Sequence, residues 1–322
     1  MPSIHRRLVL SLLLAPLAAA AQPAYPNRPI KLVVPFAPGG TADNFARIVG
    51  QAVSQRIGQP VVVDNKPGGG GVIAADFVAK SPPDGYTLLV ADVGANAVAA
   101  GLFPKLPYDA LKDFAPISLG TTVPMVLIAH PGLPANTLQE LVALAKAKPG
   151  TLNFGSAGAG GISHLAGEMF KIQAQLDMVH VPYKGGAQSL QGLTSGDTQL
   201  MFVTGSSGLP QVKAGKVKAI AVAAARRAHF MPAVPTMAEG GVANFTADSW
   251  SGVLAPAGTP QPIVDLLARE FQAALKEPAV HARLTGMGFE VLARPPEEFA
   301  SFLASEVQKW TRVIKTAGVK PD

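Results

Sequence analysis

Short apolar runs that end in glycine or proline, each followed by a helical pattern, recur along this chain and constrain its fold more than any other feature. Residues 30–35 are typical of a strand, and apolar side chains between 45 and 57 then recur at helical spacing. The pattern continues with a strand at 61–63, a helix at 72–80 and a strand at 87–91. Because strands that alternate with helices form a parallel sheet with helices on both faces, this order predicts an α/β fold.

A second round of the same alternation follows Pro124. One of its helices opens with a capping box formed by Thr137 and Glu140. Strands are predicted at 125–129, 152–155, 178–181, 200–203 and 217–223, and helices at 137–148, 164–173 and 187–195.

After a short strand predicted at 252–255, the alternation of strands and helices gives way to helical patterns alone. Three helical patterns each have proline near the first turn, where proline is well tolerated, and we expect them to cover the first sheet. The chain then leaves a first domain near residue 124 and returns to it near 250, so that two crossings form a two-strand hinge. The closing helices are predicted at 262–276, 278–287 and 296–317, domain 1 at 22–124 and 250–322, and domain 2 at 125–249.

Residues 1–21 are typical of a removable signal peptide, which indicates that the protein is secreted. Arg6 and Arg7 follow His5 at a positive end, residues 8–17 are apolar, and small residues precede a cut ahead of Gln22. The apolar stretch is short for a membrane span, and a buried N-terminal helix or a lipid-free anchor is the alternative. The chain contains no cysteine, which excludes disulfides, thiolate metal sites, a cysteine nucleophile and lipoprotein anchoring.

Charge narrows the range of partners. The formal net charge is +6, and loss of Arg6 and Arg7 with the signal peptide would leave +4. A mild positive excess attracts anions over a distance, although a basic surface without function is the alternative. Lysine and arginine form no stripe interleaved with aromatic residues, so nucleic acid is not an expected partner.

Residues 35–43, Pro-Phe-Ala-Pro-Gly-Gly-Thr-Ala-Asp, join the carboxyl end of the first strand to the first helix. Ligands of open α/β sheets bind at this edge. Gly39 and Gly40 let the backbone come close to a ligand, Thr41 and Asp43 can cap the helix, and the helix N-terminus offers unpaired N–H groups to an anion. The segment indicates a carboxylate site without arginine, and a plain turn capped by Asp43 is the alternative.

Residues 155–164, Gly-Ser-Ala-Gly-Ala-Gly-Gly-Ile-Ser-His, repeat the strand–glycine loop–helix context in the second round. The segment lacks the third glycine of a Rossmann fingerprint and the Gly-Lys-Ser/Thr of a Walker loop. His164 is either a ligand contact or a first-turn residue that braces the loop. Two further glycine loops stand at 65–71 and 181–187. The first is interpreted as a structural strand-to-helix loop, with a place in the cleft wall as the alternative. The second again joins a strand to a helix, and its Lys184 is interpreted as a solvated side chain, with pairing to a carboxylate as the alternative.

Taken in order, these motifs resemble the Bug family, the TctC-like periplasmic substrate-binding proteins of tripartite tricarboxylate transporters. The resemblance extends from Tyr25 to the C-terminus. It is carried by the loops at 35–43, 65–71 and 155–164, the run Asp84 to Leu89, Glu168 after the second loop, Val-Pro-Tyr-Lys-Gly at 181–185, and the segments 234–239 and 250–260.

The resemblance implies a type II periplasmic binding protein, in which two α/β domains close on a small organic carboxylate and deliver it to membrane transporter subunits. In the family, the loops at 36–43 and 156–164 hold the carboxylate largely through backbone N–H groups, and ordered waters bridge other ligand oxygens. Two positions depart from the family. Gln199 stands where an acidic residue is frequent, and Asp92 stands where small hydroxyl residues are common.

The loops and the resemblance together predict the ligand-binding residues. Asp92 either favours a ligand that carries an amino group or caps the helix near Asn96. The predicted set is Phe36, Gly39, Gly40, Thr41, Asp43, Asp92, Asn96, Ser156, Ala157, Gly158, Gly160, His164, Tyr183, Gly185 and Thr204.

Other classes of protein fit the sequence less well. A Gly-x-Ser-x-Gly elbow, histidines at metal-ligand spacing and paired carboxylates in the loops are absent, so we predict a monomeric binding protein without cofactor or metal and not an enzyme. A receptor that reports its ligand to a membrane signalling partner would share this sequence and remains an alternative. The ligand itself, a dicarboxylate, an amino acid or an aromatic acid, is left open.

Overall fold

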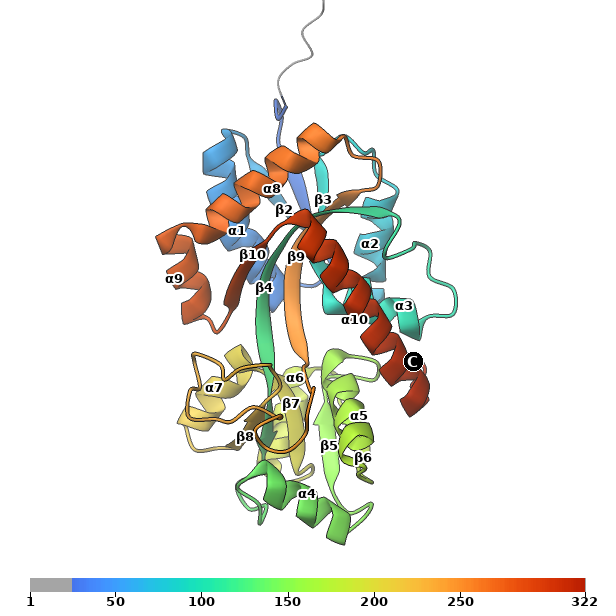
Figure 1. Cartoon of the computed structure of the whole chain (residues 1–322), viewed down its shortest axis with the longest axis vertical. Helices are drawn as coiled ribbons and strands as arrows, with labels where there is room; N and C mark the ends of the chain where they lie inside the picture. The colour runs from blue at the N-terminus through green and yellow to red at the C-terminus, as the bar shows by residue number, and fades with distance from the viewer. Residues whose placement is uncertain (1–24, 322) are drawn as a thin grey trace, which may run out of the picture.

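The computed structural model describes residues 25–321, which form two lobes stacked along the long axis of the molecule (Figure 1). The ten strands of the described residues form one sheet that passes through both lobes, in the order β2-β1-β3-β9-β4-β7-β5-β6, with β8 and β10 each paired to β4. The strands are β1 Ile30–Val34, β2 Val61–Asn65, β3 Thr87–Asp92, β4 Phe114–Ala129, β5 Asn153–Ser156, β6 Val179–Pro182, β7 Leu200–Thr204, β8 Lys218–Val222, β9 Asp248–Pro256 and β10 Glu290–Arg294.

The first lobe confirms the alternation predicted for the start of the chain. β1 pairs in parallel with β2 and with β3, and helices connect the strands. The apolar residues between 45 and 53 of α1 are buried, as their helical spacing requires. The connecting helices are α1 Thr41–Ile57 and α2 Val72–Ala79, which follows the single turn η1 Gly69–Gly71. After β3 come the short π-helical turn η2 Gly94–Val98 and α3 Ala99–Leu102.

The sheet as a whole is mixed, which corrects the expectation of a parallel sheet. β9 runs antiparallel to both β3 and β4, and β7 runs antiparallel to β4. The reason is topological, because β4 carries the chain out of the first lobe and β9 carries it back. Within the second lobe, β5 is parallel to β6 and to β7, as predicted.

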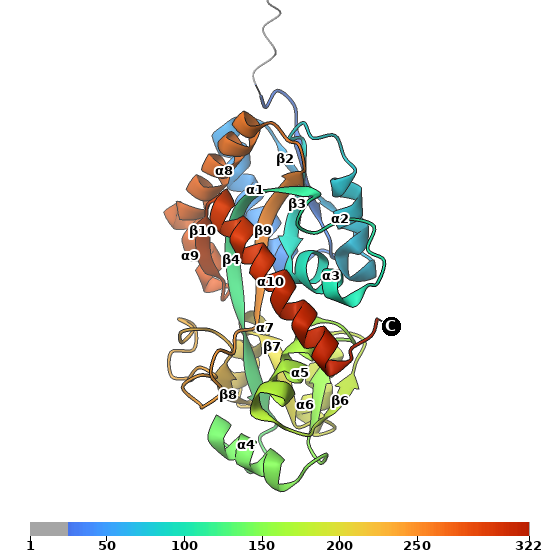
Figure 2. The same cartoon turned by 45° about the vertical axis from the view of Figure 1, so that its right-hand side comes forward.

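The second lobe packs four helices around its strands (Figure 2). The predicted capping box is confirmed, since the Glu140 amide donates to Thr137 Oγ1 at 3.2 Å and the Thr137 amide donates to Glu140 Oε2 at 3.3 Å. The helices are α4 Leu138–Ala147, α5 Ile162–Ala174, α6 Gly186–Ser195 and α7 Gly205–Lys213.

Three closing helices contact the first sheet as expected. α8 packs on α1 and β4, α9 packs on α1 and β10, and α10 packs on β4 and η2. α10 also continues past the first lobe to contact α5 of the second lobe, which the sequence pattern did not indicate. The bounds are α8 Gln261–Lys276, α9 Pro278–Gly286 and α10 Pro296–Ala317.

The crossing strands are longer than predicted, and one strand was missed. β4 begins at Phe114 and not at residue 125, because its first half, which contains Pro116, still pairs with β9 despite shifts of register. β9 likewise begins at Asp248. β10, which pairs with β4, lies in a segment that shows no clear strand pattern.

Residues 1–21, the predicted signal peptide, lie outside the described residues. Within residues 25–321, none of the helices combines the length and the apolar character that a membrane span requires.

Candidate functional site

A cavity of about 520 Å³ lies between the two lobes, and residues of both form its wall. The second lobe contributes the loop between β5 and α5 and the first turn of α5. The first lobe contributes residues after β1 and most of the segment from the end of β3 to α3. The lining residues are Phe36, Gly69, Gly70, Asp92, Val93, Gly94, Val98, Ala99, Leu102, Phe103, Ala157, Gly158, Ala159, Gly160, Gly161, Ile162, Ser163, Ser249 and Pro321.

A second cavity of about 350 Å³ adjoins the same loop. Ala157, Ile162 and Ser163 belong to the walls of both cavities, so the start of α5 faces two hollows. The remaining wall comes from the second lobe alone. It consists of Met125, Gly186, Ala187, Leu190, Met201, Phe202, Val203, Thr204 and Ser207.

The N-terminus of α5 gives the larger cavity an electropositive wall without a cationic side chain. Gly161 caps the helix in an extended conformation, with φ −74° and ψ 163°. The first amides of a helix have no carbonyl partner within it and carry partial positive charge, and the residues at the first two positions, Ile162 and Ser163, line the cavity. Gly158 and Gly160 have φ of 144° and 71°, which only glycine adopts readily, so the loop needs both glycines to reach the helix.

Side chains beneath the loop fix its shape. The Gly160 amide donates to His164 Nδ1 at 3.0 Å, and the Ala157 amide donates to Ser163 Oγ at 3.0 Å. Buried Ser156 accepts a hydrogen bond from the Gly158 amide at 3.3 Å. His164 therefore braces the loop, which is one of the two roles predicted for it from the sequence.

Two histidines stack behind this loop. The rings of His164 and His180 lie parallel, with centroids 3.6 Å apart and an interplanar angle of 6°. His180 Nε2 lies 2.7 Å from Ser156 Oγ, and His164 Nε2 lies 3.7 Å from Glu168 Oε1. Burial, together with the charge of His164, lowers the pKa of His180 to about 4. Burial alone would raise the pKa of Glu168, but the nearby His164 ring and the hydrogen bond that Lys171 donates at 3.0 Å outweigh it and hold that pKa below the usual value.

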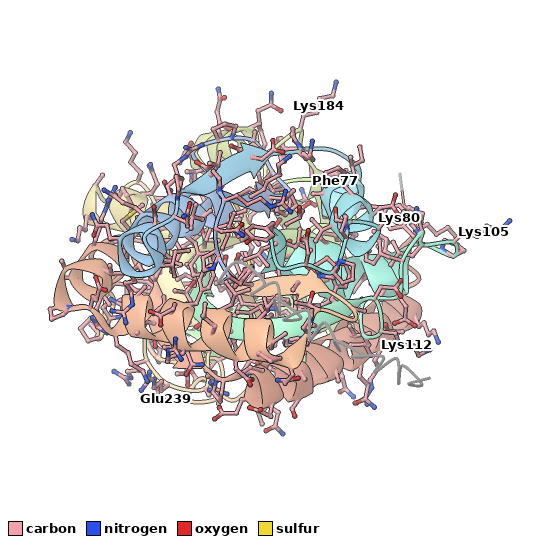
Figure 3. All side chains as sticks on the ribbon, turned by 90° about the horizontal axis from the view of Figure 1, so that it is seen from above. Phe77, Lys80, Lys105, Lys112, Lys184 and Glu239 are labelled. Atoms are coloured by element: carbon pink, nitrogen blue, oxygen red, sulfur yellow. The ribbon has the colours of Figure 1, made fainter. Side chains whose placement is uncertain are left out.

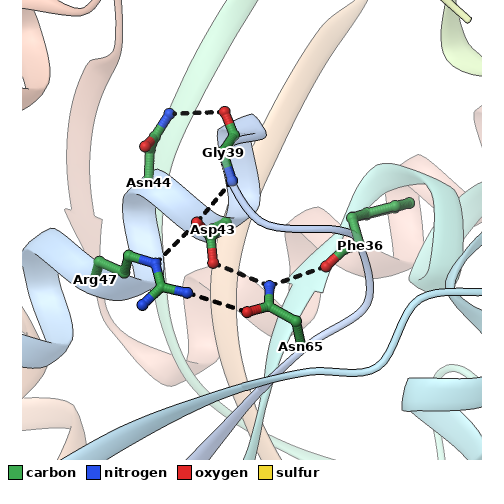
Figure 4. A network of polar contacts seen from close by, with 6 residues as sticks. All are labelled: Phe36, Gly39, Asp43, Asn44, Arg47 and Asn65. Carbon is green, nitrogen blue, oxygen red and sulfur yellow. Dashed lines mark hydrogen bonds and ion pairs between the residues drawn. The ribbon is translucent and has the colours of Figure 1, made fainter.

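The first glycine loop is closed by a polar network around Asp43 (Figure 4). Asp43 Oδ2 accepts from the Gly39 amide at 2.8 Å and from Arg47 Nε at 2.9 Å, while Oδ1 accepts from Asn65 Nδ2 at 2.9 Å. Although burial raises the pKa of Asp43, these hydrogen bonds and the charge of Arg47 hold it below the usual value. The Asp43 carboxylate therefore stabilises the loop and is fully engaged within it.

Asp92 lies at the end of β3 and is both a cap and part of the cavity wall. Its Oδ1 accepts from the Gly94 amide at 2.6 Å and from the Ala95 amide at 3.2 Å, while the Asp92 amide donates to Asn96 Oδ1 at 3.1 Å. The residue is 8% exposed. Burial raises the pKa of Asp92 to about 6, because its cost outweighs the hydrogen bonds from the backbone amides.

The structure brings some of the predicted site residues together and separates others. Phe36, Asp92, Ala157, Gly158 and Gly160 line the larger cavity, and Ala157 and Thr204 line the smaller one. Within the described chain, the remaining members of the predicted set are outside both walls. They are Gly39, Gly40, Thr41, Asp43, Asn96, Ser156, His164, Tyr183 and Gly185.

Tyr183 and Lys184 point away from the larger cavity for different reasons. A Cβ built at Gly192 would stand 2.1 Å from Tyr183 Oη, so the tyrosine packs against α6 inside the second lobe. Lys184 is exposed and projects outward, as do Lys80, Lys105 and Lys112 (Figure 3).

Several cavity residues were missed from the sequence. Val98, Ala99, Leu102 and Phe103 form an apolar wall from η2 and α3, and Ser249 and Pro321 come from the crossing strand and the end of the chain. Apolar residues in a short helix form no sequence motif, so the sequence does not show whether they line a cavity or belong to the hydrophobic core. The glycine run at 65–71 did offer a signal, since Gly69 and Gly70 line the cavity where a purely structural loop was favoured.

Two α/β lobes that the chain crosses twice, with a cavity between them, define the class of periplasmic binding proteins. The model of the tripartite tricarboxylate transporter family receptor matches residues 45–319. Protein BugT of Bordetella pertussis is 37% identical over 304 residues, which cover 94% of this chain and 93% of BugT. The chain belongs to this receptor family, whose members bind solutes in the periplasm.

Solved structures agree with this assignment. An R. palustris protein solved with adipate is 34% identical, with a TM-score of 0.81 over 92% of this chain and 100% of that one. MatC from Rhodopseudomonas palustris with bound malate is 36% identical, with a TM-score of 0.77 over 90% of this chain and 100% of that one.

Proposed function

We propose that the protein captures a small organic carboxylate in the larger cavity and delivers it to the membrane subunits of a tripartite transporter. The observation that carries the proposal is the start of α5, because Ile162 and Ser163, whose amides have no carbonyl partner within the helix, line the cavity. Backbone amides solvate a carboxylate without a buried cation, which avoids the cost of an unpaired charge in the empty protein. Adipate and malate in the related structures support a carboxylate ligand.

The domain division belongs to the same proposal. We place domain 1 at residues 22–124 and 250–322 and domain 2 at 125–249, with the hinge where β4 and β9 pass between the lobes. The register supports this division, since the β4–β9 pairing runs from Phe114↔Pro256 down to Pro124↔Asp248. Below that point β4 pairs with β7 and β8 instead.

The first glycine loop enters the proposed site by closure. Gly39, Gly40 and Thr41 stand outside the cavity wall, although Phe36 of the same loop lies in it. Rotation of the lobes about the two crossing strands would bring the start of α1 toward the start of α5 and place two helix N-termini around one carboxylate.

Gly161→Val tests the capture site. The backbone of Gly161 is compatible with valine, and a Cβ there meets only Gly158 O, at 3.5 Å, so the fold should persist while the side chain fills the cavity at the α5 amides. We expect calorimetric affinity for adipate, malate or 2-aminohexanoate, whichever binds, to fall by about tenfold or more.

Gly286→Val is the matched control, because Gly286 ends α9 with open space around its Cβ position and lies outside the cavity. Unchanged affinity in Gly161→Val, with a normal melting curve, would contradict the proposed capture site. Delivery is tested separately by uptake of the bound acid into proteoliposomes that contain the membrane subunits, with and without this protein.

A further inference from the structure

The wall of the larger cavity is apolar over much of its area. Val98, Ala99, Leu102 and Phe103 come from η2, α3 and the residue after α3, and Ile162 faces them from the second lobe. Apolar walls favour a ligand whose body is hydrocarbon, because its burial removes apolar surface from water. The carboxylate at the α5 amides then accounts for only one end of the ligand.

Asp92 is the sole ionisable side chain among the described residues that line this cavity. Lysine and arginine, which would neutralise a second carboxylate, are missing from this wall within residues 25–321. The labelled lysines of Figure 3 project from the outer surface. A second carboxylate on the ligand would therefore meet a carboxylate and no counter-charge. Like charges in a partly dry cavity repel each other strongly.

The position of Asp92 is fixed before any ligand binds. Two backbone amides, of Gly94 and Ala95, donate to one oxygen, Oδ1, which holds the side chain at the start of η2. A carboxylate has about four lone-pair sites, so two donors leave much of its accepting capacity free. The raised pKa of Asp92 agrees with this picture, since burial without a cationic partner penalises the charged form.

We propose that Asp92 makes the cavity selective for amino carboxylates, with the ligand carboxylate at the start of α5, a hydrocarbon body against the apolar wall and an ammonium group on Asp92. The same side chain excludes dicarboxylates of similar length, such as the adipate bound by a relative. This inference rests on the proposed carboxylate capture and adds the class of ligand.

Four acids with six carbons test the inference by calorimetry: 2-aminohexanoate, 6-aminohexanoate, hexanoate and adipate. The two amino acids place the ammonium near to and far from the carboxylate, while hexanoate lacks a second polar group. We expect one of the amino acids to bind about tenfold or more tightly than hexanoate, and adipate to bind most weakly. In Asp92→Asn the advantage of the amino acid should disappear and adipate should gain affinity.

Asp92→Asn keeps an oxygen that can accept from Gly94 and Ala95, so the η2 cap should survive, and Asp92→Ser is the second variant if it does not fold. Adipate binding as tightly as both amino acids, or an unchanged ranking in Asp92→Asn, would overturn the selectivity. If adipate or hexanoate binds best and Gly161→Val abolishes that binding, carboxylate capture stands and only the role of Asp92 is wrong. If none of the four acids binds, the selectivity inference is wrong as stated.

Discussion

The stacked histidines beneath the second glycine loop link the protonation of one residue to the shape of the proposed site. His180 contacts Ser156, which accepts from the Gly158 amide, and His164 holds the Gly160 amide. Two glycines of the cavity wall thus depend on neighbouring imidazoles. A charge on either ring would place a cation against its stacked partner.

The lowered pKa of His180 predicts a loss of stability in mild acid. The pKa of His180 is about 4 in the folded protein and 6.5 in the unfolded chain. Between pH 4 and pH 6.5 the folded protein therefore binds fewer protons at this residue than the unfolded chain does. Its contribution to stability is therefore complete above pH 6.5 and is lost as the pH falls toward 4. Urea unfolding of the wild type and His180→Gln across this range should show the wild type losing stability more steeply.

A buried carboxylate whose pKa is raised changes stability with pH in the opposite direction, so the comparison must be between variants. Burial raises the pKa of Asp248 to about 7, and such a group costs the folded state stability as the pH rises from 3.8 toward 7. The difference between wild type and His180→Gln removes this common contribution. His281→Gln, at an exposed position on α9, is the control. Parallel curves for wild type and His180→Gln would show that the pKa of His180 is not lowered.

At the scale of elements, α10 is anchored to the crossing strand β9 by one buried carboxylate. Trp250 Nε1 of β9 and Trp310 Nε1 of α10 both donate to Glu306 Oε2 at 3.0 Å, and Lys309 pairs with Oε1. Both indoles are fully buried and Glu306 is 5% exposed. Because α10 also contacts α5 of the second lobe, the anchor lies on a helix that touches both lobes.

Glu306→Ala should destabilise the protein by about 2–5 kcal/mol, because it leaves two buried indole N–H groups without an acceptor at roughly 1–3 kcal/mol each. Glu306→Gln keeps one acceptor oxygen and should cost less. Chemical denaturation monitored by tryptophan fluorescence measures both. The control is Glu298→Ala on the same helix. The Glu298 carboxylate forms only a half-exposed ion pair with Arg294, at 3.8 Å, so its loss should change stability by about 0.5 kcal/mol or less. A similar small effect for Glu306→Ala would mean that the two indoles find other partners.

At the scale of the whole molecule, the path of the chain suggests how the lobes move. Two antiparallel strands, β4 and β9, pass between the lobes, and the larger cavity lies beside them with Ser249 of β9 in its wall. A few residues at the point where the chain crosses between two lobes can act as a hinge. The helix α10 contacts both lobes, so closure must also shift its contact with α5.

Closure predicts that the bound protein is more compact. Small-angle scattering with a saturating concentration of the acid that binds should show a smaller radius of gyration than the ligand-free protein. Gly40→Val supplies a second readout, since Gly40 is outside the cavity wall and a Cβ there meets only Ala37 O at 3.8 Å. If closure brings this loop onto the ligand, the variant should fold normally, bind more weakly and remain extended. An unchanged scattering profile together with normal binding by Gly40→Val would argue against closure.

The sequence by itself determined most of the local elements and the order in which they occur, although α3, α7 and β10 were not predicted. Helical spacing placed α8 and α10 within a residue of their observed bounds and located the end of α1, which begins four residues before the predicted spacing. Thr137 with Glu140 marked the start of α4. These signals succeed because amphipathic periodicity and end capping involve only neighbours in the chain. The same locality made the glycine loop at 155–164 recognisable, since a strand followed by glycines and a helix start is a pattern of adjacent residues.

Only the tertiary structure decided which of those residues face one cavity. Tyr183 lies in a recognisable loop yet packs against Gly192, while Val98, Leu102 and Phe103 belong to no motif and form the cavity wall. Likewise, β4 is one continuous strand from Phe114 to Ala129 because it pairs with β9, β7 and β8, which are distant in sequence. Strand register and helix docking depend on the burial of surfaces from separate segments, and periodicity within a segment does not specify the partner surface.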